Sequence, residues 1–309
     1  MTRRPARPED AEAVLDLWHR HQSRVLGHRD STADDARDLL GDPDLDTAVV
    51  VEEGGRLVAC ALLLQAEGSG HADLDVVVDP DAGAHLLAPL LQELLDRAAA
   101  RAGAEPLAAT QACYRQDAVT ARVLEGLGLR VATTFHRMRR ELDAPVEVAV
   151  PHGVEVLPPA GAPDEEVLRR THRLHQQTFA GHDGFVAKDW DAWLEAHRAR
   201  SDPGLVWLAR VDGDDAGFLH ETDQFVEDEG AGYVWRLGVR REARGRGVAR
   251  ALLLSSFAAV RDRGRSAALL HVDTANATGA TRLYEGVGMR PVLVLDMWRT
   301  PPAPGSTGP

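Results

Sequence analysis

The two halves of this chain repeat the same order of sequence segments. The segments "TARVLEGLGLRV" (120–131) and "ATRLYEGVGMRP" (280–291) end alike and align at a spacing of 160 residues. Upstream of them, "LDVVVDPDAGAHLLAPLL" (74–91) and "WRLGVRREARGRGVARALL" (235–253) align at a spacing of 161. Two matches in the same order at nearly the same offset predict an internal duplication. Whatever one half folds into, the other is expected to fold into as well.

Within each half, the hydrophobic pattern predicts two helices, a hairpin, and then strands that alternate with helices. The hairpins are marked by Glu-Gly-Gly and Asp-Gly-Asp-Asp turns between β-rich runs. Such an order predicts two α/β lobes, each with a mixed sheet flanked by helices. Prolines recur over 141–163, where helical periodicity is missing, so the boundary is placed there. This gives one lobe over 1–145, a second over 146–300, and a disordered tail over 301–309.

Composition excludes several classes of function. The 309 residues are 44% hydrophobic and carry a formal net charge of −13, which argues against nucleic acid as a partner. Cys60 and Cys113 lie far apart and in no metal-binding spacing, so neither a disulfide framework nor a metal site is predicted. No apolar run is long enough to span a membrane, and no secretory signal follows the basic start. A cytoplasmic protein without membrane attachment is expected.

Positive charge gathers in "LGVRREARGRGVARALLL" (237–254), around a Gly-x-Gly turn. A buried strand is predicted before this turn, and an apolar-faced helix that stops near Gly264 is predicted after it. A helix that begins in small residues offers unpaired backbone N–H groups and the positive end of its dipole, which together form an anion site. Arg241, Arg244 and Arg246 add charge beside this site.

Other nucleotide-binding loops fit this stretch less well. A Walker-type loop requires Gly-Lys-Ser/Thr, which is absent from the stretch. A dinucleotide fingerprint requires a third glycine where Arg250 stands, and too few residues follow Asp273 to complete such a sheet. The remaining alternative is a solvated arginine-rich helix start that binds nothing.

Two motifs in the second half resemble those of the GCN5-related N-acetyltransferase (GNAT) superfamily. Arg244-x-x-Gly247-x-Ala249 after the "LGV" strand resembles its acyl-CoA-binding motif, and "NATGATRLYEGVGMRP" (276–291) resembles its second motif. The tandem layout and "QTFAGHDGF" (177–185) resemble the mycothiol synthases of that superfamily. The resemblance covers 163–300 well and 5–142 more loosely.

The resemblance implies two tandem GNAT-like lobes, each with a mixed, mostly antiparallel sheet flanked by helices. It also implies an acetyl-CoA-dependent N-acyltransferase. Such an enzyme transfers an acetyl group to a primary amine of a small molecule or peptide by direct attack in a ternary complex. An alternative of another class is a catalytically idle module that binds CoA or senses a ligand. A monomer or weak homodimer is expected.

The resemblance also assigns roles to residues. Those expected to bind the acetyl-CoA are Leu237, Gly238, Val239, Arg244, Gly245, Arg246, Gly247, Val248, Ala249, Asn276 and Tyr284. The strand backbone would pair with the pantetheine arm, and the N–H groups of the turn would hold the diphosphate. Tyr284 would protonate the departing thiolate, because a phenol with a pKa of about 10 stays protonated at neutral pH. An ordinary packed tyrosine is the alternative.

The sequence departs from the mycothiol synthase pattern at the expected general base. Tyr233 stands where a glutamate is expected, and tyrosine is a poor base near neutral pH. Glu221 is the first candidate to replace it and Asp273 the second. His220 and His271 lie nearby, and an amine that arrives neutral would need no base. Acceptor contacts are expected from His182, Asp223, Tyr233 and Trp235.

Carboxylates are concentrated in the run 220–230, "HETDQFVEDEG". This run could attract a cationic amine, or it could be an ordinary solvated loop.

The first half lacks the chemical groups of the second. Residues 83–86 replace the Arg244–Gly247 turn without its arginines or second glycine, Leu124 replaces Tyr284, and Gln116 replaces Asn276. Residues 1–145 are therefore expected to form a degenerate, non-catalytic GNAT-like lobe. A nonproductive ligand site there is the alternative, since backbone amides alone can bind phosphate.

Overall fold

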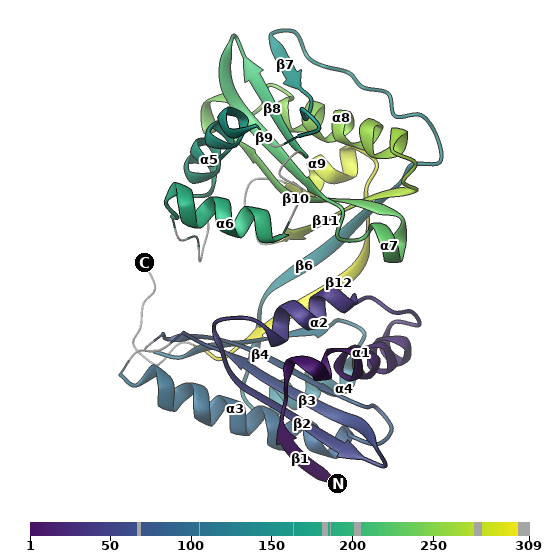
Figure 1. The fold of residues 1–309 in the computed structure, drawn as a ribbon, viewed down its shortest axis with the longest axis vertical. Coiled ribbons are helices and arrows are strands. Elements are labelled where there is room, and N and C mark those ends of the chain that lie inside the picture. The colour runs from purple at the N-terminus through teal and green to yellow at the C-terminus, as the bar shows by residue number, and fades with distance from the viewer. Residues whose placement is uncertain are drawn as a thin grey trace. The chain divides into compact units, whose positions relative to one another are not determined.

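The computed structural model describes residues 1–66, 69–104, 106–162, 164–180, 185, 187–200, 205–274 and 280–301. It contains two compact units (Figure 1). The first unit comprises Met1–Phe135 and Val294–Pro309, and the second comprises His136–Leu293.

The first unit is a sheet with helices on both faces. Its described elements are β1 (Thr2–Pro5), α1 (Ala11–Val25), α2 (Ala33–Leu40), β2 (Leu45–Glu53), β3 (Arg56–Leu64), β4 (His71–Val78), α3 (Leu87–Ala102), β5 (Ala108–Tyr114), α4 (Ala118–Gly126), the start of β6 (Arg130–Glu141) and the end of β12 (Arg290–Arg299). The strands follow the order β1-β2-β3-β4-β5-β12. The β4–β5 pair is parallel, and the other described pairs are antiparallel.

Local sequence explains the helices of this unit. The side chain of Thr32 accepts a hydrogen bond from the backbone N–H of Asp35, and the Asp35 carboxylate accepts one from the N–H of Thr32, which forms a capping box at the start of α2. Asp117 caps α4 by accepting from the N–H of Thr120. Apolar side chains of α1 and α2 pack on one face of the sheet, and those of α3 and α4 pack on the other.

The second unit repeats this plan. Its described elements are β7 (Val154–Leu157), α5 (Glu165–Phe179), α6 (Trp190–Arg200), β8 (Val206–Val211), β9 (Asp214–Thr222), α7 (Val226–Glu229), β10 (Ala231–Val239), α8 (Val248–Asp262), β11 (Ala267–Asp273), α9 (Ala280–Gly286) and the end of β6. The strands follow the order β6-β11-β10-β9-β8-β7. The β10–β11 pair is parallel, whereas β7–β8, β8–β9 and β9–β10 are antiparallel. The predicted α/β fold of two tandem lobes is confirmed.

The last strand of each half lies in the sheet of the other unit. Strand β12 ends the second half of the sequence but pairs antiparallel with β5, with Leu295 opposite Tyr114 and Arg299 opposite Thr110. Strand β6 ends the first half but neighbours β11. Just beyond it, the N–H of Leu142 donates to the carbonyl of Ser266 at 2.8 Å. A division near residue 145 follows the sequence repeat, whereas the compact units exchange these strands.

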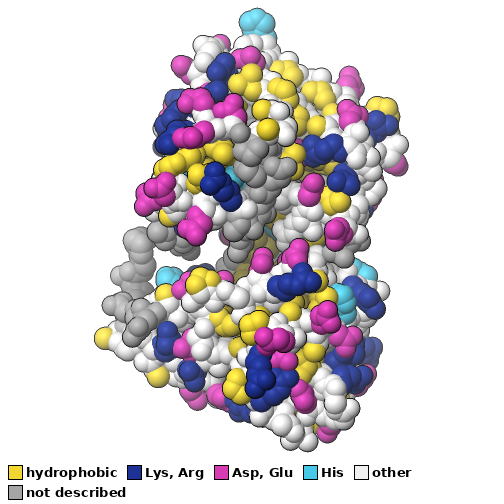
Figure 2. Space-filling view, viewed as in Figure 1, with side chains coloured by type: hydrophobic (Ala, Val, Ile, Leu, Met, Phe, Trp, Pro, Cys, Tyr) yellow, Lys and Arg dark blue, Asp and Glu magenta, His cyan; other side chains and the backbone are white. Residues whose placement is uncertain are grey.

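Charged side chains of both signs are interspersed on the face of the protein shown in Figure 2. Cys60 and Cys113 are buried, free thiols. None of the described helices combines the length and the apolar character needed to cross a bilayer.

Candidate active site

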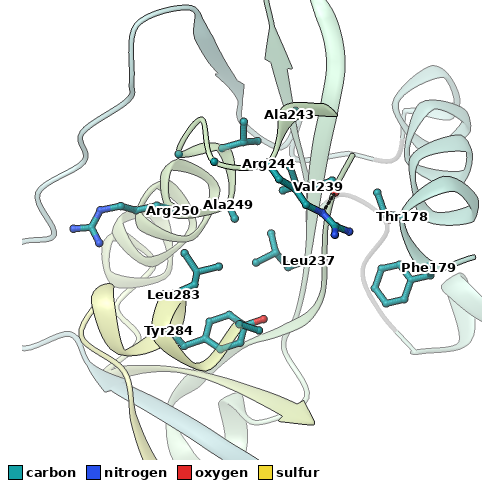
Figure 3. A pocket seen from close by; sticks show the side chains of 15 residues that line it. Thr178, Phe179, Leu237, Val239, Ala243, Arg244, Ala249, Arg250, Leu283 and Tyr284 are labelled. Atoms are coloured by element: carbon teal, nitrogen blue, oxygen red, sulfur yellow. Dashed lines mark hydrogen bonds between the residues drawn. The ribbon is translucent and has the colours of Figure 1, made fainter. Parts of the chain in front are cut away.

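A cavity of about 350 Å³ lies in the second unit between β10, α8, α9 and the end of α5 (Figure 3). It is lined by Thr178, Phe179, Leu237, Gly238, Val239, Ala243, Arg244, Gly245, Gly247, Val248, Ala249, Arg250, Ala280, Leu283 and Tyr284. Most of the residues expected to bind acetyl-CoA are therefore brought together around one cavity.

The turn at one end of the cavity depends on two glycines. Gly245 and Gly247 have φ angles of +77° and +80°, a left-handed conformation that side-chain-bearing residues rarely adopt. A Cβ atom on Gly247 would also lie 2.7 Å from Cγ of Pro151. Gly247 is the N-cap of α8, and no side chain caps this helix. The first N–H groups of α8 are thus available to an anion beside the cavity.

The arginines around this turn have different roles. Arg244 lines the cavity, and its Nε donates to the carbonyl of Val239 at 3.3 Å. Arg250 also lines the cavity and donates to the carbonyl of Gly286 at 2.5 Å. Arg246, which was expected at the diphosphate, is not among the lining residues and forms an ion pair with Asp212 at 2.7 Å.

The difference between two of these arginines gives a prediction. We expect Arg244→Gln to weaken CoA binding by roughly tenfold, and the loss to shrink at high salt because the guanidinium is exposed. Arg246→Gln removes the pair with Asp212 instead, so its effect is expected to stay under about threefold. Calorimetric titration of both variants with CoA at two salt concentrations measures this difference. Equal losses in the two variants would contradict the arrangement.

The wall of the cavity is the end of β10. The described pairing of β10 with β11 covers Ala231–Tyr233 opposite Ala267–Leu269, whereas pairing with β9 continues to Val239. The edge of β10 beyond Tyr233 therefore faces the cavity, where an extended ligand arm could add to it as a strand does. Gly238 allows α5 to approach this edge, because a Cβ there would lie 2.4 Å from Oγ1 of Thr178.

Tyr284 lies on α9 and points into the cavity (Figure 3). Burial raises the pKa of its phenol to about 12, because the phenolate would lose its hydration. The phenol therefore stays protonated over the whole physiological range.

Glu221, the first candidate for the general base, lies elsewhere. Its side chain is fully buried and is not among those that line the cavity. One carboxylate oxygen accepts a hydrogen bond from Nε1 of Trp207 at 2.7 Å, and the other accepts an ion-paired hydrogen bond from Arg263 at the end of α8. Both carboxylate oxygens are occupied and the side chain has no exposed surface. This environment is typical of a glutamate that stabilises the fold.

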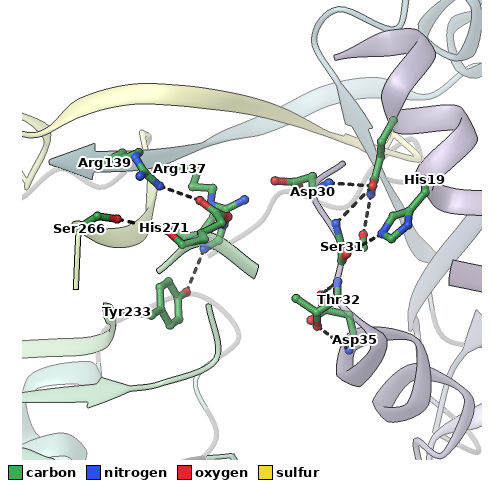
Figure 4. Close-up of polar contacts among 12 residues, drawn as sticks. His19, Asp30, Ser31, Thr32, Asp35, Arg137, Arg139, Tyr233, Ser266 and His271 are labelled. Carbon is green, nitrogen blue, oxygen red and sulfur yellow. Dashed lines mark hydrogen bonds and ion pairs between the residues drawn. The ribbon is translucent and has the colours of Figure 1, made fainter. Parts of the chain in front are cut away.

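Two of the expected acceptor contacts, Tyr233 and Trp235, lie on β10 where its described pairing with β11 ends. The hydroxyl of Tyr233 and Nδ1 of His271 lie 2.9 Å apart (Figure 4). Trp235 packs against His220 with ring centroids 5.0 Å apart, and the guanidinium of Arg236 lies 3.7 Å from the centroid of the Trp235 ring. None of these side chains is among those that line the cavity.

Other expected site residues are less informative. Asp273 is partly buried at the end of β11 and is not among the lining residues. His182 and Asn276 lie outside the described residues, as does the tail from 302 onward.

Three carboxylates of the 220–230 run lie beside arginines. Besides Glu221, Asp223 lies 3.9 Å from Arg265, and Glu229 pairs with both Arg137 and Arg139. These pairs reduce the field that the run could exert on a cationic acceptor.

Several lining residues were given no binding or catalytic role from the sequence. They are Thr178, Phe179, Ala243, Arg250, Ala280 and Leu283. Thr178 and Phe179 belong to a stretch noted only for its family resemblance. In the sequence, Arg250 counted only against a dinucleotide fingerprint, which requires a glycine at this position. Its place in the first turn of α8 nevertheless puts it beside the helix start.

The corresponding loop of the first unit is built differently. Leu124 is fully buried in the apolar core under α3 and α4, where Tyr284 of the second unit faces a cavity. The segment Ala84–Leu86 forms a 3-10 turn that runs directly into α3. A Cβ on Gly83 would lie 2.1 Å from the carbonyl oxygen of Val58, so the backbone is closely packed there.

Comparison with known proteins identifies relatives of this chain. The model of the acetyltransferase (GNAT) family matches residues 168–289. A mycothiol acetyltransferase from Thermobispora bispora is 36% identical over 190 residues, which are 58% of this chain and 61% of that protein. One from Nocardia farcinica is 30% identical over 273 residues, which are 82% of this chain and 83% of that protein. A GCN5-related N-acetyltransferase from Sphaerobacter thermophilus has a crystal structure with a TM-score of 0.80 and 26% identity, covering 96% of this chain and 94% of that one.

The chain belongs to the GNAT family of acetyltransferases. Its similarity to mycothiol acetyltransferases, expected from the repeat and the motifs, is confirmed. The match to the Thermobispora protein spans about three fifths of that relative's length, as the 61% coverage shows.

Proposed function

We propose that this protein is an acetyl-CoA-dependent N-acetyltransferase whose acceptor is a primary amine of a small molecule or peptide. The observation that carries the proposal is a single cavity with two chemically different ends. An uncapped helix start lies at one end and a protonated phenol at the other. A thioester carrier with a diphosphate needs both, because the helix start can bind the diphosphate and the phenol can protonate the sulfur.

In this proposal, each part of the cavity has a separate task. The N–H groups at the start of α8, with Arg244 and Arg250 beside them, hold the diphosphate. The edge of β10 from Leu237 to Val239 pairs with the pantetheine arm and directs the thioester toward Tyr284. The first lobe, whose equivalent loop is closely packed, is non-catalytic.

The chemical step is direct transfer. The amine nitrogen forms a bond to the thioester carbonyl carbon, the C–S bond breaks, and the phenol of Tyr284 gives its proton to the sulfur. Burial raises the pKa of the phenol to about 12, and the same burial makes the thiolate more basic because it too loses hydration. The donor and the leaving group are therefore matched within the cavity. Glu221 is left out of this reaction because its oxygens are occupied by Trp207 and Arg263.

The names of the relatives suggest which acceptor to try first. Both curated relatives described above are mycothiol acetyltransferases, so a mycothiol-related amine heads the panel. Other small amines and a peptide N-terminus complete the panel.

The test of this function is thiol release from acetyl-CoA by the full-length protein with each amine, with the acetylated product identified by mass. We expect stoichiometric thiol release and product formation for at least one amine. Binding of CoA without release for any amine would favour the idle binding module.

The matched control for this assay is Gly247→Val. A valine at 247 is strained at a φ of +80° and collides with Pro151, so the turn must move. Displacing a binding loop by about 1 Å can cost roughly 10²-fold in activity, and a loss of this size is expected for both CoA affinity and turnover. Unchanged CoA affinity in this variant would place the binding site elsewhere.

A further inference from the structure

We propose that Tyr233 and His271 form a proton relay that removes the proton from the acceptor amine during acetyl transfer. This inference rests on the proposed function and supplies the base that the reaction still lacks. It assigns Tyr233 the contact with the amine, and His271 the role of receiving the proton that Tyr233 passes on.

The first support is the place of the pair in the sheet. The described pairing of β10 with β11 ends at Tyr233 opposite Leu269, so the pair lies where these strands stop pairing. His271 is two residues beyond Leu269 and therefore lies on the same face of β11. Directly after Tyr233, the register of β10 against β9 shifts between Val234 and Arg236, which marks a bulge. The pair thus lies on β10 and β11 just before the segment Leu237–Val239 of β10, which lines the cavity.

The second support is the geometry of the two side chains (Figure 4). The Tyr233 hydroxyl lies 2.9 Å from Nδ1 of His271, within hydrogen-bond distance. The Tyr233 ring is held edge-on to Phe225, with centroids 5.1 Å apart and planes at 76°, and the residue keeps 9% of its surface exposed. His271 is partly buried. Tyr233 is buried in a small cluster with Phe225 and Leu269, so the phenol is fixed in orientation.

The third support is the charge environment of His271. Burial, and after it the positive charge of Arg137 on β6, lower the pKa of His271 to about 4. The imidazole is therefore neutral at physiological pH, and in the tautomer protonated at Nε2 its Nδ1 accepts from the phenol. Arg137 itself pairs with Glu229 at the end of α7, which also pairs with Arg139 on β6, and Asp273 lies two residues beyond His271 on β11.

The proton balance of the relay is complete. As the amine nitrogen bonds to the carbonyl carbon, its N–H proton moves to Oη of Tyr233 and the original phenol proton moves to Nδ1 of His271. The C–S bond breaks and Tyr284 protonates the sulfur, which leaves a phenolate at Tyr284 and an imidazolium at His271. After release, His271 loses one proton to solvent and Tyr284 gains one, so no further reactant is needed. A nitrogen that has given up its lone pair is acidic, so an acceptor of low basicity suffices.

Neighbouring candidates are less suited to this role. Glu221 is fully buried, with its oxygens held by Trp207 and Arg263. His220 is 1% exposed and stacks on His197 with ring centroids 4.0 Å apart, so it belongs to a closed packing layer between β9 and α6.

The test compares Tyr233→Phe and His271→Asn with wild type across the pH range. Phenylalanine keeps the ring contact with Phe225 but removes the hydroxyl. Asparagine can still accept a hydrogen bond near the Nδ1 position but cannot take up a proton. At neutral pH we expect both variants to lose roughly 10²-fold in kcat/KM for the amine, the typical contribution of a positioned base. The loss should shrink as pH rises, because hydroxide from the solvent can then take the proton that the relay removes.

The outcomes separate a relay from a structural role. Wild-type activity in His271→Asn would overturn the relay, because it would show that the hydrogen bond only positions the phenol. Parallel pH profiles for wild type and Tyr233→Phe would overturn it as well. Thermal melting and CoA titration of both variants should match wild type, which excludes misfolding as the cause of a loss.

Failure of the proposed function would give a different pattern, with no thiol release by wild type for any amine. In that case, NMR can still test directly whether Tyr233 and His271 are hydrogen-bonded. The ¹⁵N NMR signal of Nδ1 of His271 should move between wild type and Tyr233→Phe, because the variant lacks the phenol proton. An unmoved signal would show that the hydrogen bond does not exist in solution and would overturn the proposal.

Discussion

Replacing Tyr284 with phenylalanine is expected to reduce kcat by roughly 10²- to 10³-fold, within the range that positioned proton donors contribute. The change removes one hydroxyl from α9 and leaves the ring that lines the cavity. Without a donor the sulfur must leave as a thiolate in a desolvated site, which raises the barrier. Affinity for CoA should stay within about threefold of wild type, because the proposed diphosphate contacts lie at the other end of the cavity. Thiol-release rates and calorimetric titration measure the two quantities.

Tyr114→Phe is the matched control, because Tyr114 is the tyrosine of the first unit. Its hydroxyl accepts from Gln22 at 3.0 Å and donates to Asp30 at 3.3 Å, so the change tests stability without touching the cavity. A small loss of stability with unchanged turnover is expected. If Tyr284→Phe also kept wild-type turnover, another group or water would protonate the sulfur and the role of this phenol would be refuted.

The pH dependence of wild type provides a further check on this donor. Because burial raises the pKa of Tyr284 to about 12, its phenol remains protonated from neutral pH to about pH 10. Deprotonation of this residue should therefore not cause kcat to fall as pH rises through that interval. A loss of activity with a midpoint near the ordinary phenol value would show that the site is more hydrated than its burial implies.

The binding turn could be predicted from the sequence because its determinants are local. The positive φ angles at 245 and 247 require glycine. The helix that follows starts at Val248, the first residue of its apolar face. The duplication could be recognised for the same reason, since each copy carries its own turns and helix ends. The α/β class of both lobes follows from these local signals.

Other features depend on tertiary pairing and could not be predicted. The pairing of β12 with β5 joins segments far apart in the sequence, and the repeat favoured each half closing on itself. Arg246 and Arg250 have the same side chain, yet only Arg250 lines the cavity because Asp212 on a neighbouring hairpin draws Arg246 away. The sequence shows only the neighbours of Glu221 along the chain, and its place near the predicted site favoured it as a base. Its partners Trp207 and Arg263 are distant in sequence and reach it only in the folded protein.

The environment of Glu221 leads to the second large expected effect. Replacing Arg263 with alanine is expected to destabilise the protein by about 3 kcal/mol, the lower end of the cost of leaving a buried charge without its partner. The lower end applies because the side chain of Arg263 is 31% exposed, whereas that of Glu221 is fully buried. Denaturant unfolding at neutral pH measures the loss.

A surface pair two residues away supplies the control. Arg265 lies 3.9 Å from Asp223, whose side chain is 49% exposed. Exposed pairs contribute about 0 to 1 kcal/mol, so Arg265→Ala should change stability far less than Arg263→Ala. Similar losses in the two variants would show that the Glu221 carboxylate is hydrated in solution.

Glu221→Gln separates a structural glutamate from a catalytic one. The amide oxygen can still accept from Trp207, but the charge that balances Arg263 is lost, so the folded state should be weakened. If Glu221 is structural, turnover per folded molecule should fall by less than about threefold, because the carboxylate never meets the substrate. If Glu221 is the base, turnover should fall by roughly 10²-fold at neutral pH and recover as the amine becomes neutral at higher pH. A carboxylate enclosed by an indole and a guanidinium has no path for the amine proton, and the first of these results is the one that this arrangement requires.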